Sequence, residues 1–396
     1  MKISENWLRT WVNPAIDSEK LSDQLTMLGL EVDELAPAAK PFTGVVVGEV
    51  LTVEQHPDAD RLRVTTVNIG SGEPLQIVCG APNVRAGMKA PVAIIGAVLP
   101  GDFKIKKGKL RGIESQGMLC GASEIDLEDK IDGLLELPAD APVGMNIREY
   151  LDLDDNVIDI SITPNRGDCF SIRGIAREIG VINQLPVTAP EIKEVAATIS
   201  EEKKVVVSTE GCPRYLGRVI KNVNTKAVTP VWMERALARS GIRQHSILVD
   251  ITNYVLIELG QPLHAFDGGK VQGAVHVRQA TEAEKLVLLN EQEVELNEKV
   301  MVIADDEKAL AIAGIMGGLS SAVSDATTEI FLESAFFAPL HIAGRARSFG
   351  LHTDASQRYE RGVDFELPLI AMHRASQLIA ELAGGEFGPI TVAENA

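Results

Sequence analysis

Two short connectors rich in alanine and proline constrain the fold of this chain more than any other feature. They lie at residues 36–41 and 137–142, and between them the sequence changes to short strand-like runs separated by turn residues. The block before the first connector reads as helical and holds about 40 residues, too few to bury a core of their own. It needs a packing partner elsewhere, so we predict a β domain inserted into another domain.

The inserted domain is predicted to span residues 40–151. Its strand-like runs lie at residues 45–53, 62–69, 75–79 and 91–99. About 100 residues of such short strands favour a small closed barrel.

The interrupted domain is predicted from two blocks that are each too small alone. Residues 157–162 read as a strand, and a helix with Asp168 as a plausible N-cap follows. We expect residues 1–39 and 152–190 to form one discontinuous α/β domain. Residues 191–204, the end of a stretch rich in Pro, Glu, Lys and Ala, are the predicted linker.

Residues 205–396 mix strand and helix patterns and are predicted to form an α+β domain. The stretch 249–267 is the hardest part to explain as architecture alone, because Thr252 and Asn253 interrupt an apolar run. A Gly-Gln-Pro turn then carries His264 at its tip. A histidine there suits the positioning of a ligand or water, or it is a partly buried side chain bonded to its neighbours.

Composition narrows the function classes. No apolar run is long enough to span a bilayer and the start is no signal peptide, so we expect a soluble cytoplasmic protein with no membrane partner. The four cysteines lie far apart without a Cys-x-x-Cys pair, and His264 and His352 lack a third ligand at metal spacing; no metal site is predicted.

Charge argues against indiscriminate binding of polyanions, because the formal net charge is -18. One run departs from this balance, with five basic residues in eight: Lys104, Lys106, Lys107, Lys109 and Arg111. The run is either a phosphate-contacting edge of the predicted barrel or a solvated loop.

Several segments of the β domain resemble a known module. Residues 56–62, 78–83, 104–111 and 118–120 together resemble the OB-fold tRNA-binding module that is appended to methionyl-tRNA synthetases. Gly121 departs from the serine expected after Cys120. The resemblance covers roughly residues 42–135 and implies an OB-fold barrel that contacts tRNA through the basic run.

Over the whole chain, five long motifs in one order resemble the β subunit of bacterial phenylalanyl-tRNA synthetase. They lie at residues 161–166, 250–254, 260–267, 314–318 and 353–362. The family is considerably longer, so the chain is similar to an N-terminal fragment. The resemblance implies a multidomain α+β protein: a discontinuous N-terminal α/β domain, the inserted OB fold and a B3/B4-type editing domain.

The resemblance also implies partners and cofactors. The complete enzyme is an α2β2 tetramer with an α subunit that attaches phenylalanine to tRNA(Phe) with ATP and magnesium. This fragment has no ATP-binding signature, so it needs no cofactor and is at most an editing hydrolase by itself.

The implied editing site hydrolyses tyrosyl-tRNA(Phe). Carried over by motif, its catalytic residues are His264, Glu333 and Thr353, and its substrate-binding residues are Arg243, Thr252, Asn253, Gly317 and Ala355. Glu333 would accept a hydrogen bond from the tyrosine hydroxyl, which an apolar synthetic pocket rejects poorly. His264, helped by Thr353, would hold the water or the terminal ribose, while Gly317 and Ala355 leave room for the ring.

Other interpretations of these residues stay open on sequence alone. Glu333 could pair with Arg345 or Arg347, and Thr353 could simply cap the following helix. The chain could be a non-catalytic scaffold for tRNA docking and subunit assembly, or a free-standing tRNA-binding protein built on the OB fold.

Overall fold

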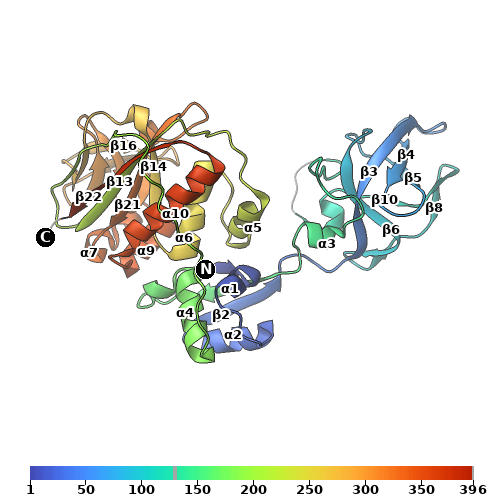
Figure 1. Cartoon of the computed structure of the whole chain (residues 1–396), viewed down its shortest axis with the longest axis horizontal. Coiled ribbons are helices and arrows are strands. Elements are labelled where there is room, and N and C mark those ends of the chain that lie inside the picture. The colour runs from blue at the N-terminus through green and yellow to red at the C-terminus, as the bar shows by residue number, and fades with distance from the viewer. Residues whose placement is uncertain (128–131, 395–396) are drawn as a thin grey trace. The chain divides into compact units, whose positions relative to one another are not determined.

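The structure, a computed structural model, describes residues 1–127 and 132–394. The chain forms two compact units, one made of Met1–Leu35 with Val157–Ala396 and the other of Ala36–Asn156. The smaller unit is therefore an insertion in the sequence of the larger one (Figure 1). None of the described helices has the length and apolar character needed to cross a membrane.

The inserted unit is built on a six-stranded antiparallel sheet in which β10-β6-β3-β4-β5 are neighbours and β7 pairs with β6. The sheet curls back on itself, because the Gln116 N–H next to β10 donates to the Gln76 carbonyl of β5 at 2.8 Å. The bounds are β3 Thr43–Gln55, β4 Arg63–Asn68, β5 Leu75–Cys79, β6 Lys89–Leu99, β7 Phe103–Lys104, β8 Gly108–Leu110, β9 Ile113–Ser115, β10 Gly117–Leu119, η1 Ser123–Ile125 and α3 Ile147–Tyr150.

The larger unit begins with a three-stranded sheet ordered β1-β11-β2 and three helices. Its elements are β1 Lys2–Ser4, α1 Glu5–Trp11, α2 Ser18–Met27, β2 Glu31–Pro37, β11 Asn156–Ser161, η2 Gly167–Cys169 and α4 Ile172–Asn183. The prediction that the sequence before the first connector is helical throughout is wrong for two segments, β1 and β2, which are strands. Because both strands pair with β11, more than 100 residues later in the chain, no local pattern reveals them.

The N-cap expected at Asp168 is also wrong. Ser171 caps α4, and its Oγ accepts from the Gly174 N–H at 3.0 Å. Asp168 lies one turn earlier in η2 and pairs with Arg166.

The remainder of the larger unit has two main sheets, ordered β14-β21-β13-β22 and β12-β15-β18-β19-β20, and a β16-β17 hairpin. The strands are β12 Val205–Val207, β13 Arg214–Lys221, β14 Leu263–Asp267, β15 Val275–Gln279, β16 Glu284–Val287, β17 Glu293–Leu296, β18 Met301–Ala304, β19 Ala309–Ile312, β20 Met316–Gly317, β21 Glu329–Phe336 and β22 Glu386–Glu394. The helices are α5 Val231–Arg239, α6 Ile247–Leu259, η3 Gly268–Lys270, η4 Leu319–Ser321, α7 Pro339–Ile342, α8 Arg345–Ser348, α9 Asp354–Arg361 and α10 Leu367–Leu382.

The four-stranded sheet separates two hydrophobic cores. Along β21, Ile330 and Leu332 point into a core shared with α6, α10 and the N-terminal block, here called the helix-side core. Phe331 and Ala335 alternate with them and point into a second core with the five-stranded sheet, here called the sheet-side core. Figure 1 shows α6 and α10 beside this sheet.

Two expectations for this half are wrong. Thr252 and Asn253 do not interrupt an element, since both lie inside α6, where tertiary burial of the helix overrides their local preference. His264 does not stand at the tip of a turn, because it lies within β14.

α7 and α8 are two separate short helices and do not form one continuous helix. They are interrupted at Gly344, whose φ of 76° is left-handed.

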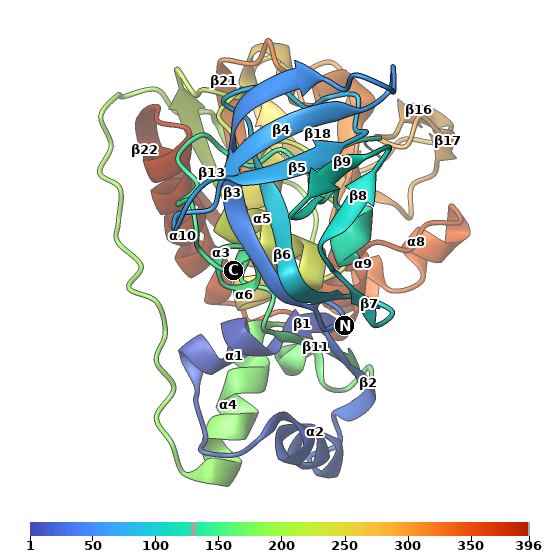
Figure 2. The same cartoon turned by 90° about the vertical axis from the view of Figure 1, so that its right-hand side faces the viewer.

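The segment before β12 has neither helix nor strand over residues 185–204. Figure 2 shows it as an extended trace along the larger unit. Backbone hydrogen bonds hold this segment against the rest of the larger unit. The Thr188 N–H donates to the Trp11 carbonyl at 2.7 Å, and the Thr198 N–H donates to the Phe387 carbonyl at 2.7 Å.

Candidate functional site

His264 and Glu333 lie directly opposite each other on neighbouring antiparallel strands. The register of β14 on β21 pairs the two residues, so their side chains leave the same face of the sheet. That face is the one occupied by Phe331 and Phe266, which belong to the sheet-side core. Strand pairing therefore brings an imidazole and a carboxyl group together.

Both side chains line one small cavity of about 70 Å³. Gly317 and Ala355 line it too, so it contains four of the eight residues expected in the site. Most of the other walls are apolar, from Ile303 on β18 and the turn at residues 311–316. The cavity is far smaller than the roughly 300 Å³ of pockets that enclose small ligands. A ring-bearing ligand can enter only if these walls move.

Glu333 is a buried acid without a basic partner among the described residues. It is 7% exposed, and its Oε2 accepts a hydrogen bond from the Tyr215 hydroxyl at 2.7 Å. Burial raises the pKa of Glu333 to about 7, although the bond from Tyr215 acts to lower it. The ion pair with Arg345 or Arg347 that the sequence left open does not form. The carboxyl group can therefore be either an acceptor or a donor near neutral pH.

His264 is a neutral imidazole at neutral pH, since burial lowers its pKa to about 4. Its ring lies edge-on to Phe266, with 4.4 Å between the ring centroids. Its Nε2 is buried and lacks a hydrogen-bond partner within the described part of the chain. Buried polar atoms in folded proteins normally have a hydrogen-bond partner. The unpaired Nε2 of His264 can therefore bind a water or a ligand.

Gly317 leaves the space that the imidazole fills. A Cβ at this position would lie 2.6 Å from Cε1 and 2.8 Å from Nε2 of His264, and 3.1 Å from Cδ1 of Leu289. A residue with a side chain at this position would therefore push the His264 ring away from its place.

Replacement of Gly317 by alanine tests this contact. We expect the displaced imidazole to reduce any hydrolysis in this cavity by about tenfold, because a misplacement of 1 Å costs up to about 100-fold. The matched control is Gly269→Ala, at a position outside the left-handed region where the nearest atom to an added Cβ is Asp267 Oδ1 at 3.4 Å, an ordinary van der Waals contact. Equal rates for parent and Gly317→Ala would show that the His264 ring has no role in the reaction.

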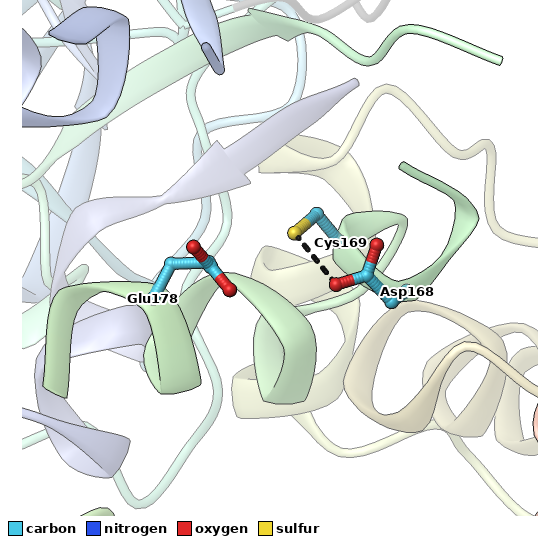
Figure 3. A group of neighbouring side chains, drawn as sticks. All are labelled: Asp168, Cys169 and Glu178. Atoms are coloured by element: carbon cyan, nitrogen blue, oxygen red, sulfur yellow. Dashed lines mark hydrogen bonds between the residues drawn. The ribbon is translucent and has the colours of Figure 1, made fainter. Parts of the chain in front are cut away.

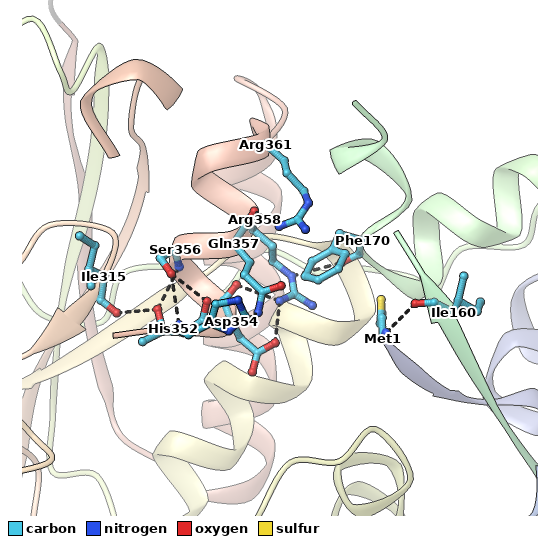
Figure 4. Close-up of polar contacts among 11 residues, drawn as sticks. Met1, Ile160, Phe170, Ile315, His352, Asp354, Ser356, Gln357, Arg358 and Arg361 are labelled. Atoms are coloured by element: carbon cyan, nitrogen blue, oxygen red, sulfur yellow. Dashed lines mark hydrogen bonds and ion pairs between the residues drawn. The ribbon is translucent and has the colours of Figure 1, made fainter. Parts of the chain in front are cut away.

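Thr353 is placed as a helix cap and outside the cavity lining. Its Oγ1 accepts from the Ser356 N–H at 3.0 Å and donates to the Ile315 carbonyl at 2.9 Å. Figure 4 shows these two partners, Ser356 and Ile315. The hydroxyl thus fixes the start of α9, which carries Ala355, to the turn that forms the opposite wall. Thr353 holds the cavity walls together, and its hydroxyl is engaged away from His264.

The remaining three expected residues are not brought to the cavity. Thr252 and Asn253 lie on α6, which packs in the helix-side core beyond the sheet, and the Thr252 hydroxyl donates to the Val249 carbonyl at 2.8 Å. Arg243 is exposed on the loop between α5 and α6.

Sequence reasoning missed the polar layer behind the acid. Tyr215 comes from β13, and Tyr359 from α9 lines the cavity and donates to the Ala335 carbonyl at 3.1 Å. Gln261 donates to the Tyr359 hydroxyl at 3.2 Å. Burial of three such side chains follows from strand and helix packing, and no local sequence signal marks it.

The basic run lies on the inserted unit, and all five of its side chains are exposed. Lys104, Lys106 and Lys107 line a cavity of about 670 Å³ together with Phe103, which is 58% exposed. Lys107 also pairs with Glu114 at 2.7 Å. An exposed aromatic ring beside cationic side chains is a pattern suited to nucleic acid.

His56 fixes the hairpin that carries part of this run. Its Nδ1 accepts from the Asp58 N–H at 3.0 Å, so the proton is on Nε2, which donates to the Leu110 carbonyl at 3.1 Å. The histidine is therefore structural.

Among the described residues, one cluster has the composition of a metal site. Figure 3 shows Asp168, Cys169 and Glu178 close together. The guanidinium of Arg166 bonds to Asp168 at 3.1 Å, to Glu178 at 3.1 Å and to the Cys169 sulfur at 2.8 Å. Burial raises the pKa of the Cys169 thiol to about 12. A cationic side chain already occupies this cluster, and the protonated thiol does not suit a metal.

Comparison with known proteins gives two family matches. The B3/4 domain family matches residues 211–384, which contain the His264–Glu333 cavity, and the putative tRNA binding domain family matches residues 45–146.

Curated relatives match over the full chain. The phenylalanine–tRNA ligase beta subunit of Acinetobacter baylyi is 82% identical over 395 residues, which cover 100% of this chain and 50% of that protein. The beta subunit of Psychrobacter arcticus is 62% identical over 402 residues, with 100% and 50% covered. The chain thus spans about half the length of the curated relatives it matches.

Among solved structures, an N-terminal fragment of the phenylalanyl-tRNA synthetase beta subunit from Pyrococcus horikoshii is 15% identical, covers 61% of this chain and 67% of that chain, and has a TM-score of 0.32. The full-length identity to the curated relatives and the two domain matches confirm the resemblance drawn from the five motifs. Over its own full length the chain therefore matches the phenylalanine–tRNA ligase β subunit, and its two domain matches fit an N-terminal portion of that subunit.

Proposed function

We propose that the His264–Glu333 cavity hydrolyses tyrosyl-tRNA(Phe) and so edits the errors of the complete ligase. The observation that carries the proposal is the in-register pairing of His264 with Glu333 at an otherwise mostly apolar cavity. Tyrosine differs from phenylalanine by one hydroxyl, which an apolar synthetic pocket rejects poorly, so a second site that selects for the hydroxyl raises fidelity.

Selectivity would come from the buried carboxyl group. The tyrosine phenol donates a hydrogen bond to Glu333, whereas a phenylalanine ring leaves one oxygen of that buried carboxylate unpaired. An unpaired buried polar group costs about 1 to 3 kcal/mol, which corresponds to roughly 5-fold to 150-fold discrimination. One of the two carboxylate oxygens is bound to Tyr215, so the other is the acceptor for the substrate.

Hydrolysis would need positioning more than a nucleophilic side chain, because the aminoacyl ester is already activated. The buried Nε2 of His264 supplies a hydrogen bond to the attacking water or to the terminal ribose. Replacing His264 by alanine in the complete ligase tests this role. We expect tyrosyl-tRNA(Phe) to persist, and its unchanged removal would favour the alternative, a non-catalytic scaffold for tRNA docking and subunit assembly.

A second proposal concerns the inserted unit. We infer that residues 40–151 form an OB fold that contacts tRNA through Phe103 and the basic run. The proposal is supported by the cavity that Phe103 shares with Lys104, Lys106 and Lys107 and by the match to a putative tRNA binding domain.

Salt dependence tests the binding of RNA by this run. Changing Lys104, Lys106 and Lys107 to glutamine should lower the slope of log affinity for tRNA(Phe) on log salt by about 0.7 to 0.9 for each phosphate that the variant no longer neutralises. The control carries glutamine at three exposed lysines of the larger unit, Lys285, Lys299 and Lys308. A slope that falls equally in both variants would contradict a specific role for the run.

The remaining activity belongs to the complete ligase. We propose that this chain acts with an α subunit in a cytoplasmic α2β2 tetramer that attaches phenylalanine to tRNA(Phe) with ATP and magnesium. The Asp168 cluster is filled by Arg166 and does not suit magnesium. The chain by itself should show no ATP–pyrophosphate exchange.

A further inference from the structure

Tyr215 lies directly behind the acid of the cavity. The register of β13 on β21 places Gly217 opposite Glu333 and Tyr215 opposite Ala335, so Tyr215 is a diagonal neighbour of Glu333 on the same face. The tyrosine is 0% exposed, and its hydroxyl donates to Glu333 Oε2 at 2.7 Å. Glu333 is thus flanked by a phenol from β13 and an imidazole from β14.

Gly217 makes this contact possible. A Cβ at Gly217 would collide with the ring of Phe331, which covers the glycine. With no side chain directly opposite the acid on β13, the longer Tyr215 reaches the carboxyl group diagonally. Tyr215 does not line the cavity, so it acts on the acid without contact to a ligand.

We propose that Tyr215 is a positioning residue for the proposed hydrolysis, holding one oxygen of Glu333 so that the other faces the phenol of a tyrosyl ester. The inference rests on the proposed function of the cavity. Glu333 would then accept from two phenols, one built into β13 and one brought by the substrate. A fixed carboxylate loses less rotational freedom on binding than a free one, which favours recognition of the incoming hydroxyl.

The ionisable groups around Glu333 allow a pH test. His264 faces it from β14, Tyr359 from α9, and Cys212 lies just before β13. Burial and, after it, the negative charge of Glu333 raise the pKa of Tyr215 well above its usual value. Burial also raises the pKa values of Tyr359 and Cys212. His264 is neutral above about pH 4. Near neutral pH, the group of this set that titrates is Glu333.

The experiment is Tyr215→Phe in the complete ligase, assayed for hydrolysis of tyrosyl-tRNA(Phe) from about two pH units below to two units above the pKa of Glu333, which is about 7. Loss of the bond that lowers the pKa of Glu333 should move the low-pH limb of the rate profile upward by about one pH unit. The matched control is Tyr254→Phe, which removes a buried hydroxyl in the helix-side core. Its limb should stay where the parent's is.

An infrared titration of the Glu333 carboxyl group, identified by its absence in Glu333→Gln, gives a readout that does not depend on hydrolysis. An unchanged limb, or an unchanged pKa of Glu333, in Tyr215→Phe overturns the role of Tyr215. If the parent and Glu333→Gln hydrolyse tyrosyl-tRNA(Phe) equally, the proposed function fails instead. A raised pKa of Glu333 in Tyr215→Phe would then still establish the hydrogen bond, while its assignment to substrate positioning would fall.

Discussion

Replacing Glu333 by glutamine in the complete ligase is expected to slow hydrolysis of tyrosyl-tRNA(Phe) by about 10-fold to 150-fold, because a hydrogen bond to a charged group contributes about 1.5 to 3 kcal/mol. Glutamine keeps the size of the side chain and still accepts a bond from Tyr215, so the slower rate reports the carboxylate. Attachment of phenylalanine should be unchanged. The measurement is the rate at which purified tyrosyl-tRNA(Phe) is deacylated, with phenylalanyl-tRNA(Phe) in parallel.

The control for this variant is Glu329→Gln, four residues earlier on the same strand. Glu329 pairs with Lys221 at 3.8 Å and lies away from the His264–Glu333 cavity. An equal decrease of hydrolysis in both variants would point to damage to β21, and an unchanged rate in Glu333→Gln would leave the scaffold interpretation.

The Glu333→Gln substitution is also expected to stabilise the protein, relative to the parent, at alkaline pH. Burial raises the pKa of Glu333 from 4.5 to about 7, so the folded state binds more protons than the unfolded state between these values. Stability contributed by this group is therefore present below pH 4.5 and is lost as pH rises through 7. The decrease is about 3 kcal/mol. Glutamine does not titrate, so the Glu333→Gln variant does not lose this stability.

Denaturant unfolding of this chain at pH values from below 4.5 to above 7 measures the effect. The stability difference between Glu333→Gln and the parent should grow by about 3 kcal/mol across this range. His264 has the opposite dependence, with a folded pKa of about 4 below its usual 6.5, but it is present in both proteins and cancels in the difference. A difference that stays constant with pH would mean that Glu333 is not desolvated.

Local patterns predicted the elements that are long and bounded by turn residues. The insertion followed from the two connectors and from the small size of the first block, and β3, β4, β5 and β6 followed from short runs of strand-forming residues bounded by turns. β1 and β2 could not be found, because a strand whose partner lies more than 100 residues away carries no local signature.

In the candidate site, too, residue types could be predicted from the sequence, whereas contacts between distant strands could not. The residue types at His264 and Glu333 came from family motifs, but their convergence depends on the β14–β21 register, which the sequence does not contain in readable form. Thr252 looked like a break and is helical because α6 is buried on several sides. Tyr215 was missed since its link to Glu333 joins strands 118 residues apart.

A crystal structure of this chain with a non-hydrolysable tyrosyl-adenosine analogue would show whether Glu333 receives the phenol of the substrate. We expect the walls at residues 311–316 and α9 to move apart, and the phenol to lie within hydrogen-bond distance of the Glu333 oxygen that Tyr215 does not hold. The ribose or a water should lie beside His264 Nε2. An analogue bound elsewhere, or a ring in this cavity whose hydroxyl points away from Glu333, would contradict the proposed recognition.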